Sequence, residues 1–222
     1  MAEAAGWSRR RFLAASTTGA AGLALAGCGL ASSSSPDRAS ASDERSSFGG
    51  SLVDPPLAKP DVTFTTTDGK PFPFRQETEG KLALLYFGYT NCPDQCPVFL
   101  STLARARDAI GTGPGSRPQV LFVGVDLKRD TPKVLETYLK RIDATFIGLT
   151  GSEQVIADAN ASLHFPPIEI GEPDANDDYL VGHLSRGVAY TSDNGGHRLY
   201  GDDTRQQQWV RDLPRLAQDR YR

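Results

Sequence analysis

Residues 82–86 form an unbroken apolar run, and residues 120–125 and 145–149 are also mostly apolar. Runs of this length are typical of strands that are buried on both faces of a sheet. Elsewhere apolar residues recur every three or four positions, which predicts helices. The predicted helices cover residues 98–110, 131–142, 152–163 and 204–218. Strands that alternate with helices predict an α/β fold, with helices on both faces of a central sheet.

Two further regions alternate between apolar and polar residues around a turn, which predicts β-hairpins. They are residues 61–66 with 72–74, and residues 184–191 with 198–200. The first hairpin forms an N-terminal extension of the predicted sheet, and antiparallel strands make that sheet mixed. Residues 165–179 are acidic and proline-rich and are predicted to be a loop.

The N-terminus has the pattern of an export signal. Residues 8–13 read Ser-Arg-Arg-Arg-Phe-Leu, an uncharged apolar stretch continues to residue 26, and Leu-Ala-Gly-Cys closes the segment at Cys28. Paired arginines before an apolar run are typical of twin-arginine export, and the last four residues match a lipobox. We expect residues 1–27 to be a lipoprotein signal peptide and Cys28 to be acylated. The mature protein is then anchored by lipid on the extracytoplasmic face of the cell membrane.

Composition divides the remaining chain into a tether and a domain. Residues 28–51 are rich in serine and contain few residues that could be buried, so we expect a flexible tether. Residues 52–222 are long enough to form one stable hydrophobic core without disulfide bonds. The formal net charge of the whole chain is −3, so it has no basic excess to bind a nucleic-acid backbone.

The candidate chemistry lies directly after the first buried strand. Residues 87–97 read Phe-Gly-Tyr-Thr-Asn-Cys-Pro-Asp-Gln-Cys-Pro and hold Cys92 and Cys96, the two cysteines that remain once Cys28 is acylated. Their spacing would bring the two sulfurs together on one turn of helix. The loop leads into a helix N-terminus, whose dipole stabilises a thiolate. Thiol exchange, a soft metal ion and a stapling disulfide all fit such a pair.

A metal ion needs a third ligand from elsewhere in the chain, and the sequence contains three histidines. His183 precedes a strand that is expected to run beside the cysteine-bearing strand, which favours it. His197 is expected at an exposed hairpin tip, and His164 precedes the proline-rich loop.

These residues resemble the Sco/SenC copper chaperones. Residues 87–97 match the FGYTxCPDxCP block of that family, residues 125–132 resemble its VDPxRDTP segment, and residues 180–183 resemble the stretch that supplies its metal-binding histidine. The resemblance implies a thioredoxin-like fold that binds copper through Cys92, Cys96 and His183. It also implies a role in building the binuclear copper site of cytochrome c oxidase, with the copper-bearing subunit of that enzyme and a copper donor or thiol reductase as partners.

The chain departs from the family pattern at Gly182, where Asp is usual, and at Leu127, where Pro is usual. Both positions lie outside the three expected ligands, where side chains tune metal affinity and partner docking. A Cys₂His set suits Cu(I), and Cu(II) could recruit a further ligand such as water or Asp126.

Two other functions use the same cysteines. A thiol–disulfide reductase would keep the metal-ligand cysteines of a partner reduced, with Cys92 and Cys96 as its redox pair and His183 incidental. The CxxxC spacing favours metal binding over this activity. A peroxidase of the same fold is favoured least, because only Thr90, two residues before Cys92, suggests it.

Overall fold

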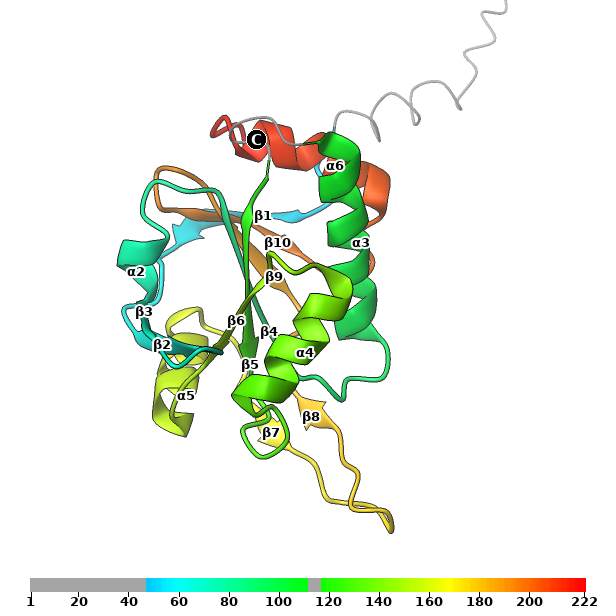
Figure 1. Ribbon diagram of the computed structural model, residues 1–222. Coiled ribbons are helices and arrows are strands. Elements are labelled where there is room, and N and C mark those ends of the chain that lie inside the picture. Colours follow the sequence, from blue (N-terminus) through cyan, green and yellow to red (C-terminus); the bar gives the residue numbers. More distant parts are fainter. Residues whose placement is uncertain (1–46, 112–116) are drawn as a thin grey trace, which may run out of the picture. The chain divides into compact units, whose positions relative to one another are not determined.

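The computed structural model describes residues 47–111 and 117–222, so the predicted signal peptide, Cys28 and most of the predicted tether lie outside it. In this part of the chain the main sheet has eight strands (Figure 1). In spatial order the strands are β1 (Ser51–Leu57), β10 (Gly196–Tyr200), β9 (Gly187–Tyr190), β4 (Ala83–Gly88), β5 (Gln119–Gly124), β6 (Ile147–Thr150), β2 (Thr63–Thr66) and β3 (Pro71–Pro73). A separate two-stranded hairpin consists of β7 (Glu169–Ile170) and β8 (Val181–Gly182).

The sheet is mixed, as predicted. The three apolar runs form the parallel strands β4, β5 and β6 at its centre. Strand β9 pairs antiparallel with β4, which confirms that the strand after His183 runs beside the cysteine-bearing strand. The predicted N-terminal hairpin, β2 with β3, extends the sheet beyond β6.

Helices cover both faces of this sheet. They are α2 (Phe74–Glu77), α3 (Gln95–Ile110), α4 (Pro132–Ile142), α5 (Glu153–Ser162) and α6 (Gln206–Leu216). Helices α3, α4 and α6 pack on one face, and α5 and α2 pack on the other (Figure 1). Each face of the sheet has its own hydrophobic core. In β4, Leu85 and Phe87 belong to the core under α5, whereas Leu84 and Tyr86 belong to the core under α3. A strand exposes alternate side chains to opposite faces, so each face needs its own cover.

The predicted helix starts at Thr131 and Ser152 are confirmed. The Thr131 side chain accepts a hydrogen bond from the Val134 amide, and the Ser152 side chain accepts one from the Val155 amide. These caps satisfy amides that have no partner inside the helix. Helix α3 begins at Gln95 with Asp94 as its cap, three residues earlier than the hydrophobic spacing indicates.

Residues 48–51, which the sequence analysis assigns to the tether, make contacts with the domain. The Phe48 ring lies 4.1 Å from the Arg198 guanidinium carbon, the Gly49 amide donates to Asp212, and Ser51 already belongs to β1. Hydrophobic pattern did not predict β1 because adjacent prolines interrupt it. An edge strand tolerates proline, because one side of its backbone needs no ladder partner.

Among the residues that the structure describes, none of the helices has both the length and the apolar character that crossing a bilayer requires.

We predict that Trp209→Ala lowers the free energy of unfolding by about 3–5 kcal/mol. Trp209 is fully buried, stacks on Tyr200 with centroids 4.1 Å apart and meets the Phe99 ring edge-on at 5.7 Å. Urea unfolding measures the change. Gln207→Ala on the exposed face of α6 is the control and should change stability by less than about 0.5 kcal/mol. Equal effects from the two substitutions would show that α6 does not close the core.

Candidate metal centre

Cys92 and Cys96 meet at the carboxyl end of β4. Cys96 is the second residue of α3, whereas Cys92 lies in the turn before the Asp94 cap. The two residues therefore do not share a helical turn, which corrects the expected geometry. The turn still brings them together, since the Cys96 amide donates to Cys92 Sγ over 3.4 Å. Both cysteines are free thiols in this structure.

The two thiols have opposite electrostatic environments. A hydrogen bond from the Cys96 thiol, followed by backbone N–H donors of Cys96 and Asp94, lowers the pKa of Cys92 to about 6 despite partial burial. Cys96 is fully buried, and its hydrogen bond to Cys92 together with desolvation raises its pKa strongly. At neutral pH Cys92 is therefore a thiolate and Cys96 a thiol that stabilises it.

The floor of the site is built from β4. The Tyr86 hydroxyl lies 3.7 Å from Cys96 Sγ, and its ring stacks on Phe99 with centroids 4.4 Å apart. A Cβ at Gly88 would lie 2.9 Å from Cys96 Sγ, closer than real side chains approach. Only glycine at this position therefore lets the sulfur sit against the strand.

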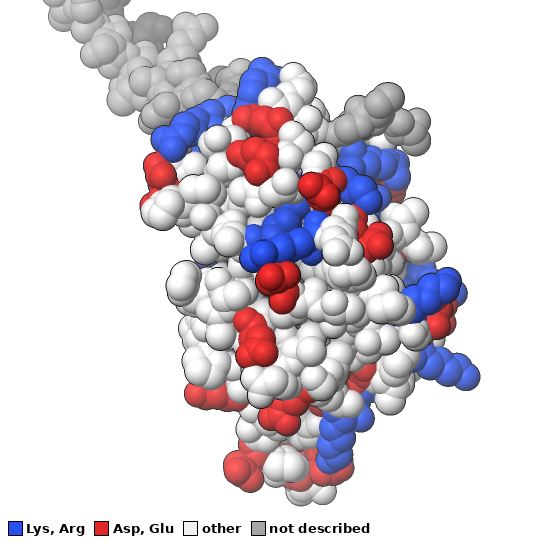
Figure 2. Space-filling view, turned by 90° about the vertical axis from the view of Figure 1, so that its left-hand side faces the viewer, with Lys and Arg blue, Asp and Glu red and all other residues white. Residues whose placement is uncertain are grey.

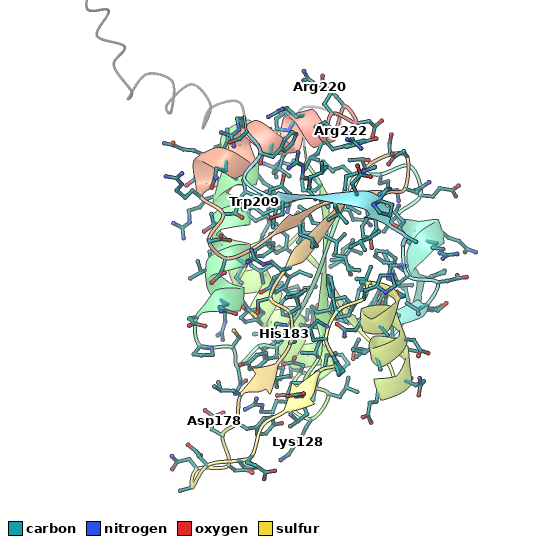
Figure 3. The ribbon with its side chains drawn as sticks, turned by 180° about the vertical axis from the view of Figure 1, so that it is seen from behind. Lys128, Asp178, His183, Trp209, Arg220 and Arg222 are labelled. Carbon is teal, nitrogen blue, oxygen red and sulfur yellow. The ribbon has the colours of Figure 1, made fainter. Side chains whose placement is uncertain are left out.

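His183 follows β8 and is half-buried (Figure 3). Its ring meets the Tyr89 ring edge-on with centroids 5.7 Å apart. Desolvation lowers the pKa of His183, so the imidazole is neutral at pH 7 and keeps a lone pair for a ligand. His183 Nδ1 is buried and has no hydrogen-bond partner among the described residues. An orphaned nitrogen of this kind is costly unless something binds it.

Tyr89 connects His183 to the cysteines. Its side chain contacts Cys92 and the backbone of Val181, and its ring packs on His183. In the described residues, however, no three side chains of His, Cys, Asp or Glu are grouped closely enough to hold a metal ion. The structure thus brings the two sulfurs together and places His183 against their neighbour, Tyr89. The set of Cys92, Cys96 and His183 stays a prediction.

The other two histidines have different surroundings. His197 is buried within β10, contrary to the expectation of an exposed tip. Its Nε2 lies 2.8 Å from an Asp193 carboxylate oxygen, and its ring stacks on Tyr221 at 3.5 Å. These contacts give His197 a structural role at the C-terminus. His164 is exposed at the end of α5 and has a positive φ of 57°.

Comparison with known proteins identifies the family. The SCO1/SenC family model matches residues 54–218. The chain belongs to the SCO1/SenC family. An SCO2-like protein of Rickettsia felis is 36% identical over 55% of this chain and 58% of its own length. A putative copper-binding protein of Stutzerimonas stutzeri is 35% identical over 57% of this chain and 61% of its own length. The chain thus spans less than two thirds of these relatives.

Solved structures of Sco proteins share the fold more completely. Apo Sco1 of Thermus thermophilus has a TM-score of 0.65 and 30% identity, with 77% of this chain and 97% of that chain covered. Copper-bound ScoI of Arabidopsis thaliana has a TM-score of 0.64 and 28% identity, over 77% of this chain and 99% of that chain. This likeness confirms the thioredoxin-like fold that the sequence predicted.

An arginine that the sequence analysis did not single out ties the β7–β8 hairpin of this Sco protein to its core. Arg129 bonds to the Asp126 carboxylate, donates to an Asp178 oxygen at 2.7 Å and donates to the Tyr179 carbonyl at 2.8 Å. Its guanidinium also lies 3.6 Å from the Tyr179 ring centroid and 5.9 Å from that of Tyr89. Arg129 therefore holds the segment before His183 beside the cysteine loop. The family-like RDTP motif was the one sequence signal for this role.

Asp126, which was expected as a possible extra ligand for Cu(II), is already bonded to Arg129 and Tyr179. It is 1% exposed, pairs with Arg129 and accepts a hydrogen bond from the Tyr179 hydroxyl at 2.9 Å. Its carboxylate thus anchors the hairpin and is not free for a metal ion.

We predict that Cys92 reacts with iodoacetamide along a pH profile with a midpoint near 6, while Cys96 stays unreactive at neutral pH. Reactivity is present above the midpoint and lost as the pH falls through it, because only the thiolate attacks. Cys96→Ala removes the main donor and should move the midpoint upward. Mass spectrometry of the reduced, metal-free protein measures both sites. The exposed Val98→Ala variant should keep the wild-type midpoint, and an unshifted midpoint in Cys96→Ala would contradict the assigned cause.

We predict that Arg129→Ala speeds amide hydrogen exchange in β7 and β8 about tenfold, since it removes two charged hydrogen bonds and a cation–π contact. Arg129→Lys should give most of this effect, because an ammonium cannot reproduce the planar fork. Exchange measured by mass spectrometry in residues 169–183 tests this. Lys133→Ala, on the exposed start of α4, is the control. Unchanged protection in Arg129→Ala would mean that other contacts hold the hairpin.

Proposed function

We propose that this Sco protein binds copper through Cys92, Cys96 and His183 and delivers it to, or prepares, the binuclear copper site of cytochrome c oxidase. The observation that supports this most directly is the pairing of a thiolate and a thiol, together with a half-buried histidine that packs on Tyr89 and whose Nδ1 has no partner among the described residues. Relatives with the same fold have been solved with copper bound, in Arabidopsis thaliana and in yeast. Sco proteins act in the assembly of cytochrome c oxidase.

The donor set suits Cu(I). Two sulfurs and one imidazole are soft ligands, and three of them satisfy a monovalent copper ion. Structural zinc prefers four protein ligands in a closed site, and within the described residues no further cysteine lies in this site. Copper binding must displace the proton of Cys96, so loading releases acid and becomes weaker at low pH.

Assembly of the site requires the hairpin that leads to His183 to move. His183 now packs on Tyr89, and it is not close enough to the two sulfurs for the three side chains to share a metal ion. The gain would be a partner for Nδ1 and a charge-neutralising ion for the Cys92 thiolate. The cost would be adjustment of the contacts that Arg129 makes with Asp178 and Tyr179. Loading and closure of the hairpin are therefore coupled in this proposal.

The asymmetry of the thiols supports thiol–disulfide exchange as a second candidate function. The Cys92 thiolate would attack a disulfide of a partner, forming a mixed disulfide and releasing one partner thiolate. Cys96, once deprotonated, would then attack Cys92 Sγ and release the second partner thiolate. The products are a Cys92–Cys96 disulfide and a fully reduced partner, so two electrons pass to the partner. His183 has no part in this sequence, which distinguishes the two functions.

The cellular setting is proposed from the N-terminal pattern. Acylation of Cys28 after removal of residues 1–27 would hold the domain on the extracytoplasmic membrane face, near a membrane-bound oxidase. The oxidase subunit that carries the binuclear site and a copper donor or thiol reductase would be the partners.

We predict that the reduced protein binds one Cu(I) ion and that His183→Ala weakens binding about tenfold or more. Cys96→Ser should weaken it further, because it removes a sulfur ligand. Competition with a chromogenic Cu(I) chelator measures affinity, and X-ray absorption should show two sulfur scatterers and one nitrogen scatterer. His164→Ala, at an exposed position, is the matched control. Wild-type affinity in His183→Ala would favour the reductase.

A further inference from the structure

A cavity of about 600 Å³ opens on the face of the sheet that α5 covers. Its walls are mostly apolar, and they include Ile156, Ala157 and Ala161 of α5 together with Phe165 and Ile168 of the following loop. Cys92, Cys96 and His183 are not among its lining residues. A largely apolar cavity of this size with a few polar groups is the usual form of a ligand-binding site.

One polar side chain of the cavity wall has an oxygen atom without a hydrogen-bond partner among the described residues. Asn160 is 3% exposed, and its Nδ2 donates to the Pro166 carbonyl at 2.7 Å. Its Oδ1 is buried without a hydrogen-bond partner in the described structure. A buried amide oxygen that loses water and gains nothing costs free energy. The cavity therefore offers an acceptor for a donor group of whatever fills it.

Exposed apolar side chains surround the opening. Leu127 and Ile170 line the cavity and are 39% and 57% exposed. Leu180, the residue before β8, accepts a hydrogen bond from the Gly171 amide at 2.9 Å and is 65% exposed. These are three of the six large hydrophobic side chains that are exposed in the described residues. Such a concentration beside an apolar cavity is typical of a protein-binding surface.

The rim is acidic. Residues 169–178 contain five carboxylates and no Lys or Arg, and Glu153 also lines the cavity. Arg129 pairs with Asp178, and Lys128 pairs with Asp177 at 3.7 Å on the surface, but Glu169 and Glu172 form no ion pair among the described residues. Figure 2 shows several acidic side chains, with basic side chains among them, at the lower end of this face. The rim therefore attracts positive charge and repels an anionic lipid surface.

We propose that this cavity docks a cationic segment of a partner protein. An apolar side chain of the segment fills the cavity, an N–H group donates to Asn160 Oδ1, and flanking Lys or Arg residues face Glu169 and Glu172. The proposal does not depend on copper binding. It has a structural link to the cysteines, because Asp126 and Tyr179 line the cavity and bond to Arg129, which packs on Tyr89.

Synthetic peptides test the proposal on the full-length, reduced, metal-free protein. The probe is the octapeptide Lys-Lys-Gly-Trp-Leu-Gly-Lys-Lys, blocked at both ends. One matched peptide replaces every Lys with Glu, and another replaces Trp-Leu with Ser-Ser. Calorimetry measures affinity, and amide chemical shifts in NMR spectra locate the peptide. We expect the basic apolar peptide to shift amides of α5 and of residues 165–171. Both matched peptides should bind about tenfold more weakly or not at all.

Substitutions in the cavity lining test whether the peptide binds in the cavity. Ala161→Trp fills the cavity from an exposed helix position and should weaken binding of the probe about tenfold. Gln154→Trp, on the same helix but outside the cavity lining, changes no charge and should leave the affinity unchanged. Ala157→Trp repeats the test if Ala161→Trp unfolds the protein, as judged by circular dichroism. The double variant Glu169→Gln, Glu172→Gln should weaken binding severalfold at low salt and little at high salt.

Three results would overturn the proposal. The first is a peptide that binds with full affinity to both filled-cavity variants. The second is equal binding of the Lys and Glu peptides. The third is an absence of peptide binding together with binding of phosphatidylcholine–phosphatidylglycerol vesicles that Ala161→Trp abolishes, which would make the cavity a lipid site.

Discussion

A thiol and a thiolate share one proton at the start of α3, and the chemistry of this protein depends on that contact. Cys96 is buried against Tyr86 and Gly88, where it cannot ionise easily, and it stabilises the charge on Cys92 instead. The pair is thereby ready for either of two events. A soft cation can replace the shared proton, or a disulfide can be attacked by Cys92. Both follow from one strand end meeting one helix N-terminus.

The β7–β8 hairpin leads to His183, the third ligand of the proposed copper site. It brings His183 to the Tyr89 ring, and Arg129 holds it there through Asp178 and the Tyr179 carbonyl. Charged hydrogen bonds of this kind favour one discrete position over a continuum of positions. The hairpin therefore has one defined arrangement, which the proposed binding of a metal ion would have to change. The same hairpin forms one wall of the α5-side cavity, so a partner docked there would act on the element that leads to His183.

Several features could not be predicted from the sequence, because they arise from contacts between segments that are distant in the chain. His197 follows two glycines, which suggests an exposed turn, yet Tyr221 from the C-terminus stacks on it and buries it. Strand β1 contains adjacent prolines that hide its pattern, and it exists because β10 offers a free edge. Arg129 stands in a polar motif, and only the folded chain brings Asp178 and Tyr179 to it.

The sequence by itself determined the buried strands β4, β5 and β6, the caps of α4 and α5, the family, and the position of the two cysteines at the active end of the sheet. These features are local, because hydrophobic period, capping side chains and motif spacing act over a few residues. Tertiary structure decided the unequal pKa values of the thiols, the contact of His183 with Tyr89, the acceptor left free on Asn160 and the cavity beside α5. Each of these depends on burial and on neighbours far away in the chain, which no local pattern encodes.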